Sequence, residues 1–179
     1  MEIFDSDVIE LANIAHSYYG VCDVGGAKVV QLASHINTEL GETHVIPRNN
    51  KFIRVKRNVD LCVITVDSLT ERKRIWDSGL IRTRYWVDLR TAWDQIESWC
   101  VDMSSDAHKI AYQETLTRKA NHELPCGAKA TAGITIGAAN YIIGSIVYNV
   151  VNSTLPPFHI YMKLGPAFVT VQQNPEEKY

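Results

Sequence analysis

The chain has 179 residues, 46% of them hydrophobic and 21% charged, which are the proportions of an ordinary globular protein and exclude a disordered or fibrous one. Its net charge of -2 supplies no overall positive field to hold nucleic acid or an anionic membrane. Four cysteines without a CxxC pair argue against structural zinc and favour free thiols in a reducing compartment, so we expect a cytoplasmic protein.

Strand and helix patterns alternate through the first half of the chain. The expected elements are a short strand at 2–4, an amphipathic helix at 24–40 ended by Gly41, a short strand at 43–46, an apolar strand at 61–66, a helix at 69–79 with exposed residues 71–74, and a strand at 85–89. This alternation is typical of βαβ units, so the sequence predicts an α/β fold with a Rossmann-like open sheet.

The second half predicts a polar helix at 106–120, an apolar helix at 132–151 and a C-terminal β-hairpin formed by 158–164 and 167–173. Residues 132–151 carry no charge and are long enough to cross a bilayer. Asn140, Asn149 and the absence of basic flanking clusters instead favour the central buried helix of a soluble fold, without a membrane partner.

Three aspartates are expected at the carboxyl ends of strands, where open α/β sheets bind their ligands: Asp5, Asp67 and Asp88. Such carboxylates can accept hydrogen bonds from a ribose or hold a magnesium ion. Aspartates at strand ends are also common turn formers and helix N-caps. Position alone leaves both readings open for each residue.

The order of several motifs resembles the ubiquitin-activating-like (ThiF/E1-like) adenylating enzymes, which include the thiamine and molybdopterin sulfur-carrier adenylyltransferases. The opening IFDSDVIELANIAHSYYGVCDVGGAKV matches the family's D-x-D strand end, its acidic or polar residue and Asn, and its G-x-x-K, at Asp5, Asp7, Glu10, Asn13, Gly25 and Lys28.

Three later segments extend the resemblance to about residue 165. VDLCVITVDSLTERKRIW carries Asp67 and Arg72, YWVDLR carries Asp88 and Arg90, and ELPCGAKATAGITIGAANYIIGSIV resembles the family's loop and central apolar helix. The resemblance implies one ThiF/E1-like domain over residues 1–179, with an open sheet and a C-terminal β-hairpin.

The resemblance also implies a reaction, the MgATP-dependent activation of the C-terminal carboxylate of a small β-grasp protein, ubiquitin-like or sulfur-carrier, as an acyl adenylate. In that reading Asp5 holds the ribose, Asp7 belongs to the same cofactor-binding set, and Asn13 positions a phosphate oxygen. Lys28 neutralises charge on the phosphates, and Asp67 holds magnesium.

Cys126 precedes the apolar helix, and a thiol at a helix N-terminus has a lowered pKa. Some members of the family use a cysteine to take the activated carboxyl as a thioester. Cys126 is therefore a candidate nucleophile, and the alternative is a small thiol packed in the core.

Two departures from the family pattern affect the functional reading. No GxGxxG occurs, and the chain begins at what resembles the family's second strand, so the first βαβ unit with its phosphate-binding loop has no counterpart. The family's arginine after the Asn is either replaced by His16 or lies elsewhere in the chain. We therefore expect a homo-oligomer or a complementing subunit, with a non-catalytic ThiF-like binding or scaffold protein as the alternative. The absent Gly-rich turn also disfavours a dehydrogenase.

Overall fold

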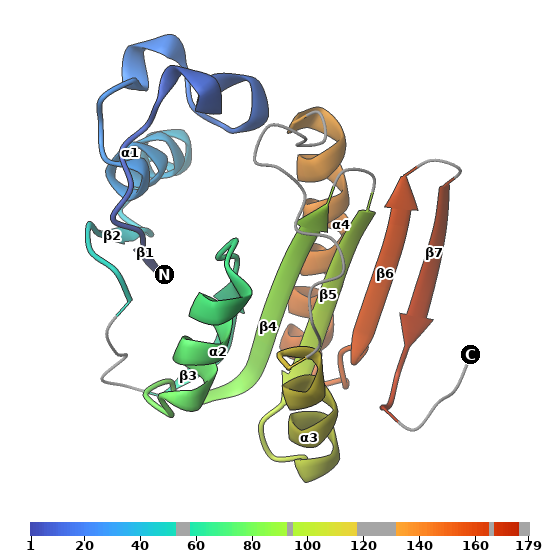
Figure 1. Cartoon of the computed structure of the whole chain (residues 1–179). Coiled ribbons are helices and arrows are strands. Elements are labelled where there is room, and N and C mark those ends of the chain that lie inside the picture. Colours follow the sequence, from blue (N-terminus) through green and yellow to red (C-terminus); the bar gives the residue numbers. More distant parts are fainter. Residues whose placement is uncertain (53–57, 93–94, 118–131, 165–166, 176–179) are drawn as a thin grey trace. The chain divides into compact units, whose positions relative to one another are not determined.

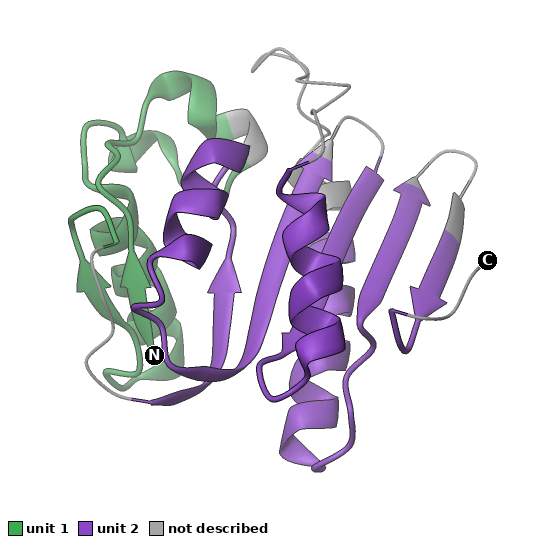
Figure 2. Cartoon of the chain, turned by 60° about the horizontal axis from the view of Figure 1, so that its bottom comes forward, with its two compact units in different colours: residues 1–53 green, residues 54–179 purple. Residues whose placement is uncertain are grey.

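The computed structural model describes residues 1–52, 58–92, 95–117, 132–164 and 167–175. The chain divides into two compact units, Met1–Ile53 and Arg54–Tyr179 (Figure 2). No helix among the described residues is long and apolar enough to cross a membrane.

Unit 1 is a small βαβ arrangement with two parallel strands. Its elements are β1 (Glu2–Phe4), the 3-10 helices η1 (Leu11–His16) and η2 (Val21–Asp23), α1 (Lys28–Leu40) and β2 (Ile46–Arg48), with Glu2 of β1 paired with Ile46 of β2. The predicted helix and its end are confirmed, because α1 buries Val29 and Ala33 on one face and stops at Gly41, whose φ is 71°.

The second strand of unit 1 begins later than the expected 43–46. The side chain of Asn37 explains the difference, since its Oδ1 accepts hydrogen bonds from the backbone N–H groups of His44 (2.9 Å) and Val45 (2.8 Å). Its Nδ2 donates to the Val45 carbonyl at 2.9 Å. These backbone groups are thereby satisfied outside a β-ladder, and pairing starts at Ile46.

Unit 2 contains one five-stranded sheet in the order β3-β4-β5-β6-β7 (Figure 1). β3 and β4 are parallel, and the remaining neighbours are antiparallel. The elements are β3 (Val59–Ile64), α2 (Leu69–Asp77), β4 (Thr83–Ala92), β5 (Gln95–Asp102), α3 (Asp106–Thr115), α4 (Ala132–Val151), β6 (His159–Leu164) and β7 (Ala167–Gln172).

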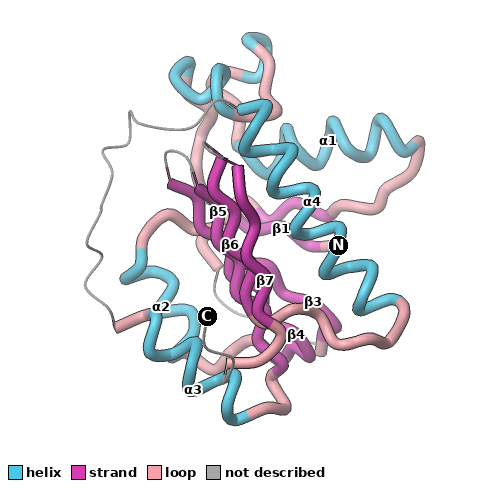
Figure 3. Tube along the Cα trace, turned by 90° about the vertical axis from the view of Figure 1, so that its right-hand side faces the viewer, coloured by secondary structure: helices cyan, strands magenta, loops and turns pink. Residues whose placement is uncertain are grey.

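The helices of unit 2 cover both faces of this sheet, with α4 on one side and α2 and α3 on the other (Figure 3). Alternation along β4 separates the faces, because Val87 and Leu89 join the apolar core with Ile142 and Ile146 of α4. Trp86 faces the other way and contacts the ring of Trp76 in α2, with ring centroids 5.1 Å apart.

The α/β class is confirmed, as are α2, α4 and the C-terminal hairpin. The stretch between β4 and α4 differs from the expectation in two ways. β5 was not predicted, although its residues alternate between half-buried and buried in the manner of a strand. It returns antiparallel beside β4, so the sheet is mixed. The polar helix is also shorter than 106–120, because α3 ends at Thr115 and a turn follows at 116–117.

Candidate functional site

Three of the predicted site residues meet in unit 1, where β1 ends and α1 begins. The Oδ1 of Asp5, directly after β1, accepts a hydrogen bond of 2.8 Å from the backbone N–H of Asp7. Lys28 is the first residue of α1, and its Nζ lies 2.8 Å from the Asp7 Oδ2. The Lys28 backbone N–H also donates to the Asp7 carbonyl at 2.9 Å. Two carboxylates and an ammonium group therefore share one end of the unit.

Glycines of the G-x-x-K segment hold this arrangement in place. The N–H of Gly25 donates to the Ile9 carbonyl at 2.9 Å, and the Ile9 N–H donates to the Gly26 carbonyl at 2.8 Å. Gly25 has a φ of 89°, a conformation that favours glycine. Ile9 itself is buried, so this loop is anchored between Asp7 and Lys28.

Asn13 lies in η1, where its side chain serves the local turn. Its Oδ1 accepts a hydrogen bond of 2.9 Å from the backbone N–H of Glu10. This bond caps η1. The backbone of His16 ends the same helix.

The same unit contains a buried carboxylate, Asp23, that sequence reasoning does not identify. Its Oδ2 accepts hydrogen bonds from the Gly20 N–H at 2.7 Å and pairs with the His35 Nε2 at 2.9 Å. The Gly20 bond, followed by the His35 bond, lowers the pKa of Asp23. A spacing of twelve residues between Asp23 and His35 matches no known motif, so only the folded chain brings them together.

Tyr19 bonds to the start of α1 and lies within the electrostatic influence of this carboxylate. Its hydroxyl donates to the Lys28 carbonyl at 3.2 Å. Burial raises the pKa of Tyr19, and the negative charges of Asp5 and Asp23 raise it further. The hydroxyl is therefore protonated at neutral pH and is a neutral donor among carboxylates.

Asp67 lies in unit 2, past the carboxyl end of β3. It is exposed and directly precedes Ser68, the N-cap of α2, whose Oγ accepts a hydrogen bond of 3.3 Å from the Glu71 N–H. No group of three or more metal-binding side chains forms among the described residues. A magnesium ion at Asp67 would take its remaining ligands from nucleotide phosphates and water, as this ion commonly does.

The structure corrects the expectations for Arg72 and Asp88. Asp88 lies inside β4, which continues to Ala92, and its side chain is 0% exposed. Arg72, expected on an exposed helix face, is 5% exposed. Its Nη1 forms an ion pair with the Asp88 Oδ1, and its Nη2 donates to the Leu89 carbonyl at 3.2 Å. Neither residue is positioned as a surface ligand.

Arg90, two residues after Asp88 in β4 and so on the same face of the sheet, completes this charge cluster. Its Nε lies 2.8 Å from the Asp88 Oδ2, and its Nη2 donates to the Thr115 Oγ1 at 2.8 Å. The Tyr112 hydroxyl donates to the same Asp88 oxygen at 3.0 Å. Burial lowers the pKa of Arg72 to about 10, so the guanidinium still carries its charge at neutral pH.

The cysteine hypothesis remains a prediction, because Cys126 lies outside the described residues. Two other thiols are unsuited to nucleophilic chemistry. Burial raises the pKa of Cys62 to about 11 and that of Cys100 to about 12. Both are therefore protonated at neutral pH.

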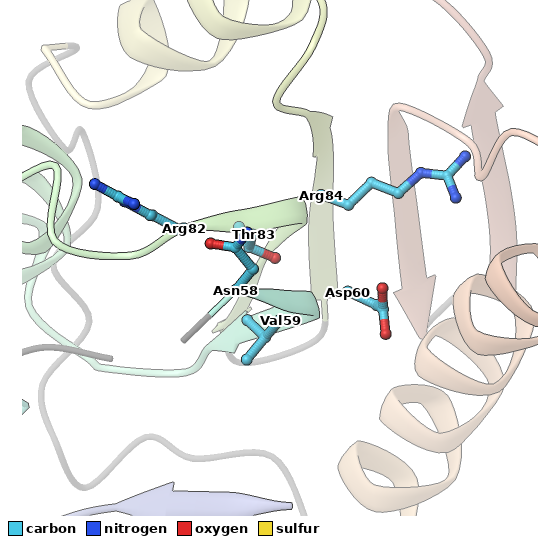
Figure 4. Close-up of a pocket in the computed structure, with 6 residues that line it drawn as sticks. All are labelled: Asn58, Val59, Asp60, Arg82, Thr83 and Arg84. Atoms are coloured by element: carbon cyan, nitrogen blue, oxygen red, sulfur yellow. The ribbon is translucent and has the colours of Figure 1, made fainter. Parts of the chain in front are cut away.

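A shallow polar pocket of about 340 Å³ lies at the opposite end of the parallel strands from Asp67 (Figure 4). Its lining comes from the amino ends of β3 and β4, and the side chains of Arg82 and Arg84 point away from each other. It is lined by Asn58, Val59, Asp60, Arg82, Thr83 and Arg84. Since α/β sheets bind ligands beyond the carboxyl ends of their strands, this pocket is separate from the candidate site.

No protein-family profile and no curated protein matches the chain. Solved structures do match in fold. PaaA is 15% identical to this chain, with a TM-score of 0.62, and the match covers 95% of this chain and 63% of the PaaA chain. Escherichia coli MccB is 14% identical to this chain, with a TM-score of 0.67, and the match covers 97% of this chain and 54% of the MccB chain.

PaaA and MccB have the ThiF/E1-like fold, so the chain shares that fold at low sequence identity. The chain spans less than two thirds of the length of either protein. MccB has been crystallised with ATP, and also with AMPCPP together with MccA. The ATP complex has 14% identity and a TM-score of 0.61 over 97% of this chain and 55% of its own.

Proposed function

We propose that the chain takes part in the ATP-dependent activation of a carboxylate as an acyl adenylate, at the C-terminus of a peptide or small β-grasp protein. The observation that carries this proposal is the grouping of Asp5, Asp7 and Lys28 where β1 ends and α1 begins. The fold shared with MccB, which has been crystallised with ATP, supports the same reading.

The charge arrangement around Lys28 favours an anionic ligand. An ammonium group at the first residue of a helix lies at the positive end of the helix dipole, which disfavours it. The carboxylate of Asp7 offsets this cost in the free chain. A polyphosphate would interact favourably with both the Lys28 ammonium and the N-terminus of α1, so Lys28 can exchange Asp7 for a phosphate oxygen.

The remaining roles follow from the donor and acceptor chemistry. The Asp5 carboxylate accepts hydrogen bonds from ribose hydroxyls, and Asn13 offers an amide to a phosphate oxygen. Asp67 would hold the magnesium ion that accompanies ATP, whose charge offsets that of the leaving pyrophosphate. Lys28 stabilises the charge that develops on the α-phosphate during attack by the substrate carboxylate.

The phosphate-binding loop would come from a complementing subunit, because the sequence contains no GxGxxG. The complex of MccB with MccA supports a polypeptide as the second substrate. In the alternative proposal the chain is a non-catalytic binding or scaffold protein. The ion pair between Asp7 and Lys28 is compatible with that alternative, since a lysine that binds no ligand would remain paired with the neighbouring carboxylate.

The test is the thermal midpoint of the full chain with and without millimolar MgATP. Ligand at about a hundredfold excess over Kd stabilises the native state by about 2.7 kcal/mol, so the midpoint should rise by several degrees. Asp67→Ala should abolish the MgATP-dependent rise, whereas Asp102→Ala, at the end of an antiparallel strand, should retain it.

An unchanged wild-type midpoint contradicts nucleotide binding by the chain alone, and leaves either a chain that binds nucleotide only together with a complementing subunit or a non-catalytic scaffold. ATP–pyrophosphate exchange then separates binding from chemistry. Exchange that appears only when a carboxylate-bearing peptide is added supports acyl-adenylate formation, and MgATP binding without exchange under any addition contradicts it.

A further inference from the structure

Tyr19 belongs to none of the sequence motifs, yet its side chain lies beside the residue that begins α1. Tyr19 is half-buried, and its hydroxyl donates a hydrogen bond of 3.2 Å to the carbonyl of Lys28. Lys28 is the residue whose ammonium group the proposed function assigns to the phosphates of ATP. The phenol of Tyr19 is therefore a second polar group at the same end of α1.

The hydrogen bond that Tyr19 makes in the free chain is weak. Bonds between a hydroxyl and an oxygen are usually about 2.5 to 3.0 Å long, so a distance of 3.2 Å lies beyond the usual range. The Lys28 carbonyl also belongs to the first turn of α1, where it accepts the backbone N–H of the following turn. This carbonyl stays satisfied without Tyr19, so the hydroxyl can turn to a stronger acceptor at little cost.

The backbone next to Tyr19 is fixed to α1 by a second set of bonds. Asp23, which is 6% exposed, accepts a hydrogen bond of 2.7 Å from the Gly20 N–H and pairs with His35 of α1 at 2.9 Å. Gly20 directly follows Tyr19 in the chain. The phenol is thus restrained both at its backbone and at its hydroxyl, so little conformational entropy is lost when it binds a ligand.

The charges around the hydroxyl keep it a hydrogen-bond donor. Burial raises the pKa of Tyr19, and the negative charges of Asp5 and Asp23 raise it further, so the phenol is protonated at neutral pH. The bond that such a donor makes to a phosphate oxygen is charge-assisted. It is therefore stronger than the present bond to a neutral carbonyl.

The other candidate phosphate ligands of unit 1 have partners in the free chain. Lys28 is paired with Asp7, and the amide oxygen of Asn13 caps η1. The sequence contains no GxGxxG, whose backbone N–H groups would supply several donors to a phosphate. A weakly bonded phenol beside Lys28 adds a donor where few others are available.

We propose that Tyr19 is a phosphate-binding residue of the nucleotide site, whose hydroxyl leaves the Lys28 carbonyl and donates to a phosphate oxygen of ATP. This role rests on the proposed function, because it needs the nucleotide site around Lys28. A ribose hydroxyl is a poorer partner for Tyr19, since it is neutral and the Asp5 carboxylate already offers it an acceptor.

Isothermal titration calorimetry of the full chain with MgATP tests the proposal. Tyr19→Phe removes only the hydroxyl and should weaken MgATP binding by about tenfold, because a hydrogen bond to a charged group is lost. Tyr18→Phe is the matched control and should bind MgATP like the wild type, since the Tyr18 hydroxyl bonds to Glu39 near the other end of α1.

A spectroscopic measurement separates phosphate binding from a purely structural role. In the chain labelled with 3-fluorotyrosine, the fluorine resonance of Tyr19 is the one that is missing from Tyr19→Phe. MgATP and inorganic tripolyphosphate should both shift this resonance, whereas adenosine should leave it unchanged. A structural role of the hydroxyl would instead lower the free energy of unfolding without a shift caused by tripolyphosphate.

The outcomes distinguish a failure of this role from a failure of the proposed function. Equal binding of MgATP by the wild type and Tyr19→Phe would overturn the role of Tyr19 and leave the nucleotide site intact. A Tyr19 resonance that adenosine shifts and tripolyphosphate does not would overturn it in favour of a ribose contact. No binding of MgATP or tripolyphosphate to the wild type would contradict a phosphate site in the chain alone, and the role of Tyr19 with it.

Discussion

Each unit contains an aspartate paired with a basic residue, both from segments that resemble the same enzymes, yet the two pairs differ in burial. In unit 1, the side chains of Asp7 and Lys28 are 62% and 23% exposed. In unit 2, those of Asp88 and Arg72 are 0% and 6% exposed. An exposed pair exchanges partners at little cost, whereas separating a buried pair leaves an unpaired charge without water.

The comparison shows that a motif residue is a candidate ligand only where the fold leaves it accessible. Asp88 is buried against Arg72, Arg90 and Tyr112, so its carboxylate is not accessible to a ligand from solvent. Asp7 holds Lys28 at the surface, where a phosphate could replace it. The following predictions concern stability in unit 2 and binding in unit 1.

Asp88→Asn should produce the largest effect. It leaves Arg72 and Arg90 facing a neutral amide in the interior, so we expect a loss of about 3–5 kcal/mol in the free energy of unfolding. Urea titration followed by tryptophan fluorescence measures it, because all four tryptophans lie in unit 2. Asp77→Asn, which breaks the exposed Lys73–Asp77 pair, should cost less than about 1 kcal/mol. Equal losses in the two variants would contradict the difference between a buried and an exposed ion pair.

Arg72→Lys should follow, with a loss of about 2 kcal/mol. A lysine keeps the charge but lacks the planar fork that reaches both Asp88 and the Leu89 carbonyl. Asp88 retains Arg90, which makes this change milder than the loss of the carboxylate itself. The same titration measures it, with Arg74→Lys on the exposed side of α2 as control. A loss no greater than that of Arg74→Lys would show that a positive charge at position 72 is sufficient to stabilise Asp88, without the guanidinium geometry.

Glu97→Gln should cost about 1 kcal/mol at neutral pH, with a characteristic pH dependence. Burial would raise the pKa of Glu97, but the hydrogen bond and charge of His159, together with Arg90, outweigh burial and lower it. A lowered pKa stabilises the folded state above the unfolded pKa of about 4.3, and this stabilisation disappears as the pH falls through the folded pKa. Urea midpoints of wild type and variant should therefore converge in acid. A difference in urea midpoint that does not change with pH would contradict the lowered pKa of Glu97.

Lys28→Ala should have the smallest effect on stability, below about 1 kcal/mol, because its ion pair is exposed. The same variant should nevertheless abolish the rise in thermal midpoint caused by MgATP. Lys109→Ala, which removes an exposed pair with Asp106 on α3, is the matched control and should retain that rise. Retention of the rise in Lys28→Ala would exclude Lys28 from the nucleotide site.

Sequence alone was sufficient for elements whose signals are local. Apolar spacing followed by Gly41 defined the end of α1, an uncharged run of twenty residues defined α4, and apolar segments on either side of Gly165-Pro166 defined the C-terminal hairpin. The order of the motifs also indicated a fold that the structural similarity to MccB and PaaA supports. Periodicity and capping act over a few neighbouring residues, so they can be recognised without the rest of the chain.

Only the tertiary structure decided which residues are buried and which are accessible. Arg72 has the sequence environment of an exposed helix face, and its burial depends on Asp88, sixteen positions away on a different element. The pairing of β5 and the bonds of Asn37 to residues 44 and 45 likewise depend on how segments apart in the sequence are placed beside each other. Burial and register arise from contacts between segments remote in sequence, and local pattern does not encode them.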